Sequence, residues 1–121
     1  MHKLMSIALI AVLLIIGTGC TPTEVGVSYF PASARPVARC IVKRESGGDP
    51  RAISPTHDYG LFQINRKAHK RNFESRYGVA FETGALDPRL NGKYARYLYD
   101  YYRSHGGSGW EPWAGGRYRC F

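Results

Sequence analysis

The longest periodic stretch of this chain begins at Asp87-Pro88. This pair is a typical helix start, because Asp caps free N–H groups and Pro fits the first turn. Apolar side chains then recur every three or four residues until Gly106-Gly107, a spacing that predicts a long amphipathic helix with a core to pack against. The stripe consists of Leu90, Tyr94, Tyr97, Leu98 and Tyr101.

Two further helices are expected upstream. The first, residues 36–45, begins with proline and stops before Gly47-Gly48. The second, residues 65–73, is crowded with basic side chains, and a polar loop or small hairpin is expected between the two helices. Because no strand-rich segment is found, the sequence predicts a mainly α fold: a small single helical domain with at most a short β-hairpin.

Residues 1–20 have the pattern of a signal peptide: a basic start, an apolar run and then small residues. The run is shorter than the about 20 residues of a stable membrane span, although an uncleaved anchor is the alternative interpretation. Small residues before Cys20 resemble the bacterial lipobox, with Gly17 where that pattern prefers Leu. The protein is therefore expected to be exported, either as a lipoprotein modified at Cys20 or by plain secretion.

Residues 21–36 are rich in Pro, Ser, Thr, Ala and Gly and contain few large apolar side chains. This composition predicts a flexible tether. One folded domain is then expected over residues 37–121, which suits a chain of 121 residues.

Export places the domain in an oxidising compartment, where thiols pair. Cys40 and Cys120 lie near the two ends of the predicted domain. A disulfide between them would stabilise a domain with a small core, by roughly 4 kcal/mol in the chain-entropy model. Two free thiols are the alternative.

The formal net charge of +8 favours anionic partners. For an exported protein these are the anionic cell wall or lipid head groups. Basic residues 66–71 are compatible with nucleic acid, but no nucleic-acid-binding motif is present, so no such partner is expected. The four His lack metal-ligand spacing, and there is no phosphate-binding Gly loop, so we expect no metal and no cofactor. The protein is also expected to be a monomer.

Two carboxylates flank the predicted loop. Glu45 ends the 36–45 helix, and Asp58 precedes a short apolar segment that carries the amides Gln63 and Asn65. A carboxylic acid beside a hydrogen-bonding groove is the minimum equipment for cutting a glycosidic bond, because the leaving oxygen needs a proton and the cationic sugar needs a nearby negative charge. The alternatives are a surface Glu45 at a helix end and an Asp58 that only binds nearby amides.

Several motifs, in order, resemble the lytic transglycosylase branch of the lysozyme superfamily. They are Glu45-Ser46-Gly47, Ala52-Ile53-Ser54, the segment from Tyr59 to Asn65, and Asp87-Pro88 with Asn91, Ala95 and Leu98. Asp58-Tyr59-Gly60 with Gln63-Ile64-Asn65 also resembles the C-type lysozyme motif, and Trp110-x-x-Trp113 is similar to small lysozyme-like proteins of actinobacteria and phages. The resemblance implies a lysozyme-like α+β fold with a peptidoglycan groove.

The resemblance makes Glu45 the general acid. In the transglycosylase branch this acid protonates the oxygen between N-acetylmuramic acid and N-acetylglucosamine, then accepts the proton of the muramic 6-hydroxyl, leaving a 1,6-anhydro end. In the hydrolytic branch a second carboxylate is nucleophile or stabiliser, and Asp58 matches it locally. Only twelve residues separate Glu45 from Asp58, fewer than in C-type lysozymes, so Asp58 can be displaced from the position of its counterpart. Two interpretations of Asp58 therefore remain open: a catalytic residue, or a loop residue that binds nearby amides.

Other side chains are assigned to the groove by the same resemblance. They are Ser46, Tyr59, Gln63, Asn65, Tyr97, Trp110 and Trp113. For Asn65 the alternative is a helix cap, and for Tyr97 and the two tryptophans it is a place in the core.

The leading hypothesis is an exported lytic transglycosylase that acts on peptidoglycan strands, of bacterial or phage origin. A hydrolytic muramidase that uses Glu45 and Asp58 is the alternative. A wall-binding lipoprotein without catalysis is a third hypothesis, and the presence of Glu45 speaks against it.

Overall fold

The computed structural model describes residues 20–121, and the predicted leader, residues 1–19, lies outside the described residues. The main helices are α2 (Pro22–Val27), α3 (Arg35–Ser46), α4 (Arg66–Tyr77), α5 (Phe81–Gly84) and α6 (Pro88–Ser104). Two short 3₁₀ helices, η1 (Ala32–Ala34) and η2 (Glu111–Trp113), complete them, and β1 (Asp58–Tyr59) with β2 (Ile64–Asn65) forms the one hairpin of this described part. The prediction of a small, mainly helical domain with a short hairpin is confirmed. None of the helices within residues 20–121 is both long and apolar enough to cross a bilayer.

Helices α3 and α6 form where local signals place them. Gly47 ends α3 in the left-handed conformation, at φ 63°, and its N–H binds the carbonyl of Lys43. At the start of α6 the Asp87 side chain accepts a hydrogen bond from the N–H of Arg89. The buried face of α6 is not quite the predicted stripe: Tyr94 and Leu98 are buried, whereas Tyr101 is 45% exposed.

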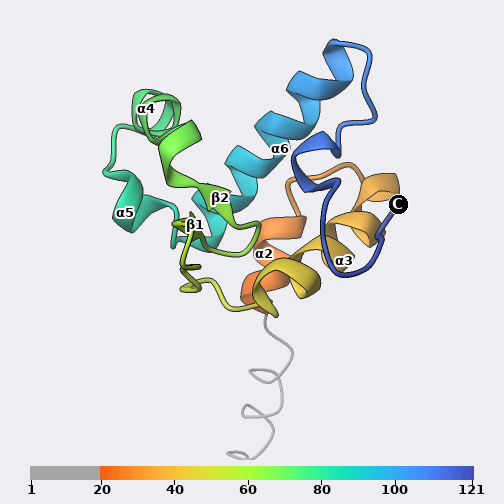
Figure 1. Ribbon diagram of the computed structural model, residues 1–121, viewed down its shortest axis with the longest axis horizontal. Helices are drawn as coiled ribbons and strands as arrows, with labels where there is room; N and C mark the ends of the chain where they lie inside the picture. Colours follow the sequence, from red (N-terminus) through yellow and green to blue (C-terminus); the bar gives the residue numbers. More distant parts are fainter. Residues whose placement is uncertain (1–19) are drawn as a thin grey trace, which may run out of the picture.

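The segment before α3 is part of the domain, and the prediction of a flexible tether over residues 21–36 is wrong. Thr21 caps α2, and Val27 and Phe30 are almost completely buried in the core. Helix α2 lies directly against α6: a Cβ on Gly92 would come within 2.5 Å of the Gly26 backbone. Only glycines allow this close approach, and the resulting contact holds a helix too short to be stable alone. Figure 1 shows α2 beside α3 and α6.

The hairpin is fixed by one buried side chain of α6. Asn91 accepts a hydrogen bond from the Phe62 N–H and donates to the carbonyls of Tyr59 and Ala85. Gly60, at the turn, packs so closely that a Cβ there would lie 2.3 Å from the Ala85 carbonyl oxygen. These contacts hold the hairpin in a fixed position relative to the core helices.

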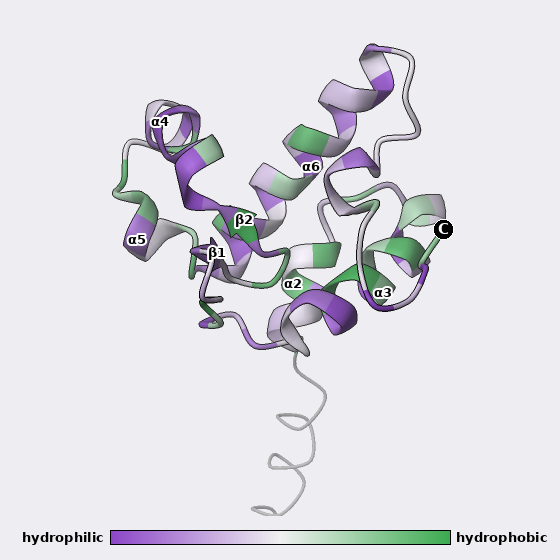
Figure 2. Cartoon of the chain, in the orientation of Figure 1, coloured by the Kyte–Doolittle hydropathy of each residue, from purple (hydrophilic) through white to green (hydrophobic). Residues whose placement is uncertain are grey.

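The C-terminal residues close the domain along α3. Cys40 of α3 is joined to Cys120, with their Cα atoms 5.6 Å apart. Trp110 and Trp113 are buried, and Trp110 stacks on Phe30. Figure 2 shows hydrophobic residues along α3, while α4 is hydrophilic over most of its length.

Candidate active site

A cleft of about 600 Å³ lies between the end of α3, the 52–63 loop and hairpin, and the C-terminal segment. Glu45, Ser54, Asp58, Gln63, Trp113 and Arg117 are among its lining residues. Three separate parts of the chain form the cleft, and two of them contribute the carboxylates that the sequence singled out, Glu45 and Asp58.

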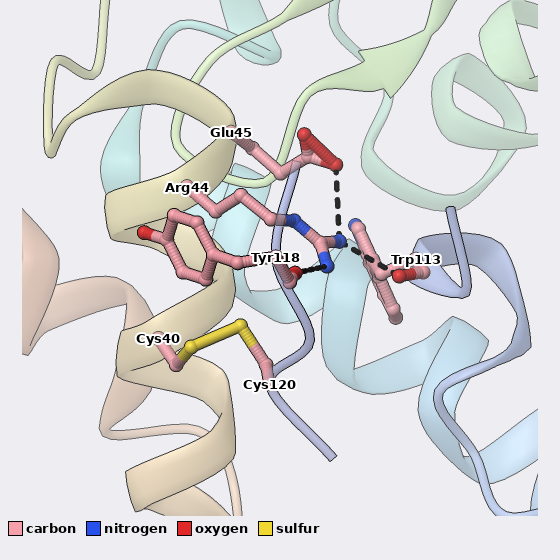
Figure 3. Close-up of a disulfide and its surroundings, with 6 residues drawn as sticks. All are labelled: Cys40, Arg44, Glu45, Trp113, Tyr118 and Cys120. Atoms are coloured by element: carbon pink, nitrogen blue, oxygen red, sulfur yellow. Dashed lines mark hydrogen bonds and ion pairs between the residues drawn. A yellow bond between two sulfur atoms is a disulfide. The ribbon is translucent and has the colours of Figure 1, made fainter. Parts of the chain in front are cut away.

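Glu45 lies in the last turn of α3, and its side chain is 26% exposed. Its Oε1 atom is 3.4 Å from the Nη2 atom of Arg44, so the carboxylate has a cationic neighbour on one side and the cleft on the other (Figure 3). A partly exposed carboxyl group on a helix end is accessible to a substrate and positioned by a rigid element.

Arg44 was not among the residues predicted from the sequence. Its side chain is 3% exposed, and it donates to the carbonyl oxygens of Trp113, at 2.7 Å, and Tyr118, at 3.0 Å. Its Nε is buried and has no partner in the described part of the chain. Gly116 packs against the guanidinium, where a Cβ would approach to 2.6 Å. Arg44 therefore fastens the C-terminal segment to the helix that carries Glu45.

Asp58 is held by side chains on both of its oxygens. Oδ2 accepts from the hydroxyls of Ser54 and Thr56, and Oδ1 accepts from Nδ2 of Asn65 at 2.9 Å. Burial alone would raise the pKa of Asp58, but these hydrogen bonds together with nearby His57 outweigh it and lower the pKa. Asp58 is thus a fixed negative charge on the wall of the Glu45 cleft.

The two amides of the hairpin, Gln63 in its turn and Asn65 at the end of β2, have different roles. Gln63 lines the cleft, and its Nε2 donates to the carbonyls of Ala52 and Gly60. Asn65 caps α4 by accepting from the Ala68 N–H, while it also binds Asp58, so it supports the site from behind. The helix-cap interpretation of Asn65 is confirmed, and its direct contact with a substrate stays a prediction.

Ser46 and Tyr59 do not line the cleft. The Ser46 hydroxyl donates to the Val42 carbonyl and accepts from the Gly48 N–H, which completes the end of α3. Tyr59 is 8% exposed and packs edge-on against Phe81. Their surroundings indicate structural roles.

The remaining aromatic residues assigned to the groove are separated by the fold. Tyr97 lines a different surface hollow with Tyr101, and the Arg76 guanidinium covers its ring at 3.9 Å. Trp110 is a core residue that stacks on Phe30. Trp113 is 3% exposed and donates from Nε1 to the Phe62 carbonyl, but it still borders the Glu45 cleft.

The predicted disulfide is present, and the third cysteine is not part of it. Cys40 and Cys120 form a disulfide, and Cys20 is exposed and lies outside it. Lipidation of Cys20 stays a prediction. Within residues 20–121, no group of three His, Cys, Asp or Glu side chains is arranged to hold a metal ion.

A model of the family described as the transglycosylase SLT domain matches residues 29–115. The chain belongs to this family. The match begins before α3, in agreement with the burial of Phe30, and it confirms the resemblance to lytic transglycosylases of the lysozyme superfamily. Membership of this family indicates a transglycosylase-type enzyme that acts on peptidoglycan. No curated protein and no solved structure gives a significant match.

Proposed function

We propose that this SLT domain cleaves the β-1,4 bond between N-acetylmuramic acid and N-acetylglucosamine by transglycosylation. The observation that carries the proposal is the placement of Glu45 at the end of α3, on the wall of a cleft large enough for sugar rings. Among residues 20–121, Glu45 and Asp58 are the carboxylates that line this cleft. Asp58 accepts hydrogen bonds from several side chains, whereas the Glu45 carboxylate, within this described part, accepts one only from Arg44 and is free to exchange a proton with a substrate.

The reaction needs one proton donor that later becomes a base. Glu45 donates a proton to the glycosidic oxygen as the C1–O4 bond breaks. The resulting Glu45 carboxylate then takes the proton of the muramic 6-hydroxyl as O6 bonds to C1, which restores the acid. No water is consumed, and the product ends in a 1,6-anhydro ring. Asp58 contributes negative charge beside the cationic sugar and keeps its own hydrogen bonds throughout.

A hydrolytic muramidase is the second candidate, since Asp58 shares the cleft with Glu45 and has a lowered pKa. As a nucleophile, however, Asp58 would have to release donors from Ser54, Thr56 or Asn65. This network favours the transglycosylase, in which Asp58 forms no covalent bond.

Product analysis decides between the two reactions. Purified peptidoglycan is digested in ¹⁸O-labelled water, and the fragments are analysed by mass spectrometry. A transglycosylase yields muramyl ends lighter by one water and free of label. Labelled reducing ends would establish the hydrolase, and no cleavage of any kind would contradict both.

We also propose that the protein is exported as a monomer to the bacterial cell wall. Support comes from the leader pattern of residues 1–20 and from the net charge of +8, which suits an anionic wall. Cys20 is exposed and therefore accessible to lipidation. Metabolic labelling with a fatty acid, compared between the wild type and Cys20→Ser, tests the lipid anchor.

A further inference from the structure

Two guanidinium groups, those of Arg44 and Arg117, line the Glu45 cleft, and they differ in whether other groups of the protein already bind them. Arg44 is buried and engaged by Trp113, Tyr118 and Glu45. Arg117 is exposed and forms no ion pair with any carboxylate of residues 20–121. Arg117 is therefore the cation of this cleft that is available to a ligand.

The backbone that carries Arg117 is fixed on both sides. The carbonyls of Trp113 and Tyr118, which flank it in sequence, both accept hydrogen bonds from Arg44. Beyond them Cys120 is covalently joined to α3. Gly116, next to Arg117, has φ 146° and leaves room for the Arg44 guanidinium directly against the chain. Figure 3 shows the contacts of Arg44 with Trp113 and Tyr118 and the disulfide of Cys120. The segment that carries Arg117 is thus secured at both ends.

A cation in this cleft would help to bind a substrate that itself carries carboxylates. Asp58 places negative charge where the proposed substrate binds. The glycan rings of peptidoglycan are neutral, but each muramic acid carries a lactyl group that ends in a carboxyl, either free or extended by a peptide with its own carboxylates. A guanidinium matches a carboxylate in shape and charge and offers two parallel N–H donors.

We infer that Arg117 binds a carboxylate of the muramic acid side chain, on the lactyl group or on its peptide, and so selects muramyl residues that carry this charge. The inference rests on the proposed function, because it names the part of that substrate which the cleft recognises. Arg117 is a specificity-determining residue, and the bond cleavage itself is performed elsewhere in the cleft.

The test compares Arg117→Gln with Arg119→Gln. Arg119 has the same charge and is also exposed, two residues further along, but it lines a different hollow, beside Phe121. Each protein is assayed on peptidoglycan with free carboxylates and on the same material after its carboxylates are converted to amides. We expect Arg117→Gln to lower kcat/KM on the free-carboxylate form about fivefold, the effect of an ion pair that stays partly in water. It should leave the amidated form unchanged, while Arg119→Gln matches the wild type on both.

A third substrate locates the carboxylate. Strands stripped of peptide by an amidase keep only the lactyl carboxylate. In peptide-bearing material the lactyl carboxyl is an amide and carries no charge. If Arg117→Gln loses activity only on the stripped strands, the lactyl carboxylate is bound; if it loses activity only on the peptide-bearing material, a peptide carboxylate is bound, and either result supports the inference. Equal activity of Arg117→Gln and wild type on all three substrates would overturn it. A wild type that cleaves none of them contradicts instead the proposed function.

Discussion

The Arg44 guanidinium donates a 2.7 Å hydrogen bond to the carbonyl oxygen of Trp113, 69 residues away along the chain. The same Nη2 atom lies 3.4 Å from the carboxylate of Glu45. One buried side chain thereby links the candidate acid to the opposite wall of its cleft. The width of the cleft and the position of the acid are set together.

Replacing Arg44 by Met should lower the free energy of unfolding by about 3 kcal/mol, because the carbonyls of Trp113 and Tyr118 lose a charged donor and the buried Arg44 side chain no longer joins the C-terminal segment to α3. Arg44→Lys keeps the charge but cannot reach both carbonyls with one ammonium group, so an intermediate loss is expected. Urea unfolding measures both, with Lys43→Met as the control, since Lys43 is the exposed neighbour. An Arg44→Met protein as stable as the control would contradict the fastening role.

Replacing Glu45 by Gln should reduce cleavage of peptidoglycan by about 10²–10⁴-fold and leave the fold intact, because the amide cannot donate the required proton. The rate of dye release from labelled cell walls measures the loss, and near-ultraviolet circular dichroism checks the fold. Asp49→Asn, which changes an exposed carboxylate outside the cleft, is the control. A Glu45→Gln protein that lyses walls near the wild-type rate would remove Glu45 from the mechanism.

Asp58→Asn separates the two chemistries. For a transglycosylase the variant keeps its anhydro products and loses activity only modestly, because the muramic 6-hydroxyl is the nucleophile. For a hydrolase the loss should approach that of Glu45→Gln, since an amide is neither a nucleophile nor a negative charge. We expect the modest loss. A folded variant with almost no activity, together with reducing-end products from the wild type, would assign the muramidase reaction.

Acid should weaken the fold through Asp58. The lowered pKa of Asp58 means that its hydrogen bonds to Ser54, Thr56 and Asn65 stabilise the folded state at neutral pH. This contribution is complete above the pKa of an unfolded Asp, about 3.9, and is lost as the pH falls through the lower folded value. Wild type should therefore lose more stability than Asp58→Asn when unfolding is measured at pH 6 and again near pH 3. Parallel losses in the two proteins would show that the network adds nothing.

Reducing the Cys40–Cys120 bond should lower the melting temperature and the activity together. The bond spans 80 residues, for which the chain-entropy model gives about 4 kcal/mol, and it secures the segment that lines the cleft. Thermal unfolding with and without reductant measures the first effect in a Cys20→Ser background. Cys40→Ser/Cys120→Ser should behave like the reduced protein, and reductant should leave that variant unchanged.

Signals within a few residues were enough to predict α3, α6 and the place of Glu45 at the end of α3. Proline and Asp at the helix starts and glycine at the end of α3 act locally, so the sequence contains them directly. Helix α2 was missed because what stabilises it is its contact with α6, at Gly26 and Gly92, far apart in sequence.

The arrangement of the candidate site also depends on contacts between residues that are far apart in the sequence. That Asp58 points into the Glu45 cleft depends on Asn91, which positions the hairpin from α6. Nothing in the sequence around Arg44 indicates that this side chain will be buried by a segment that lies 69 to 74 residues further along the chain. Trp110 and Trp113 share one motif, yet the fold places only Trp113 beside the cleft.

The early start of α2 changes how far a membrane-attached form would reach. Thr21 already caps the helix, so Cys20 adjoins the folded domain directly. A disordered stretch over residues 21–36 would have acted as a leash of roughly 50 Å when extended. With that stretch folded, acyl chains on Cys20 would hold the enzyme at the bilayer surface. Its substrate would then be the innermost glycan, the layer of the wall closest to where new strands are made.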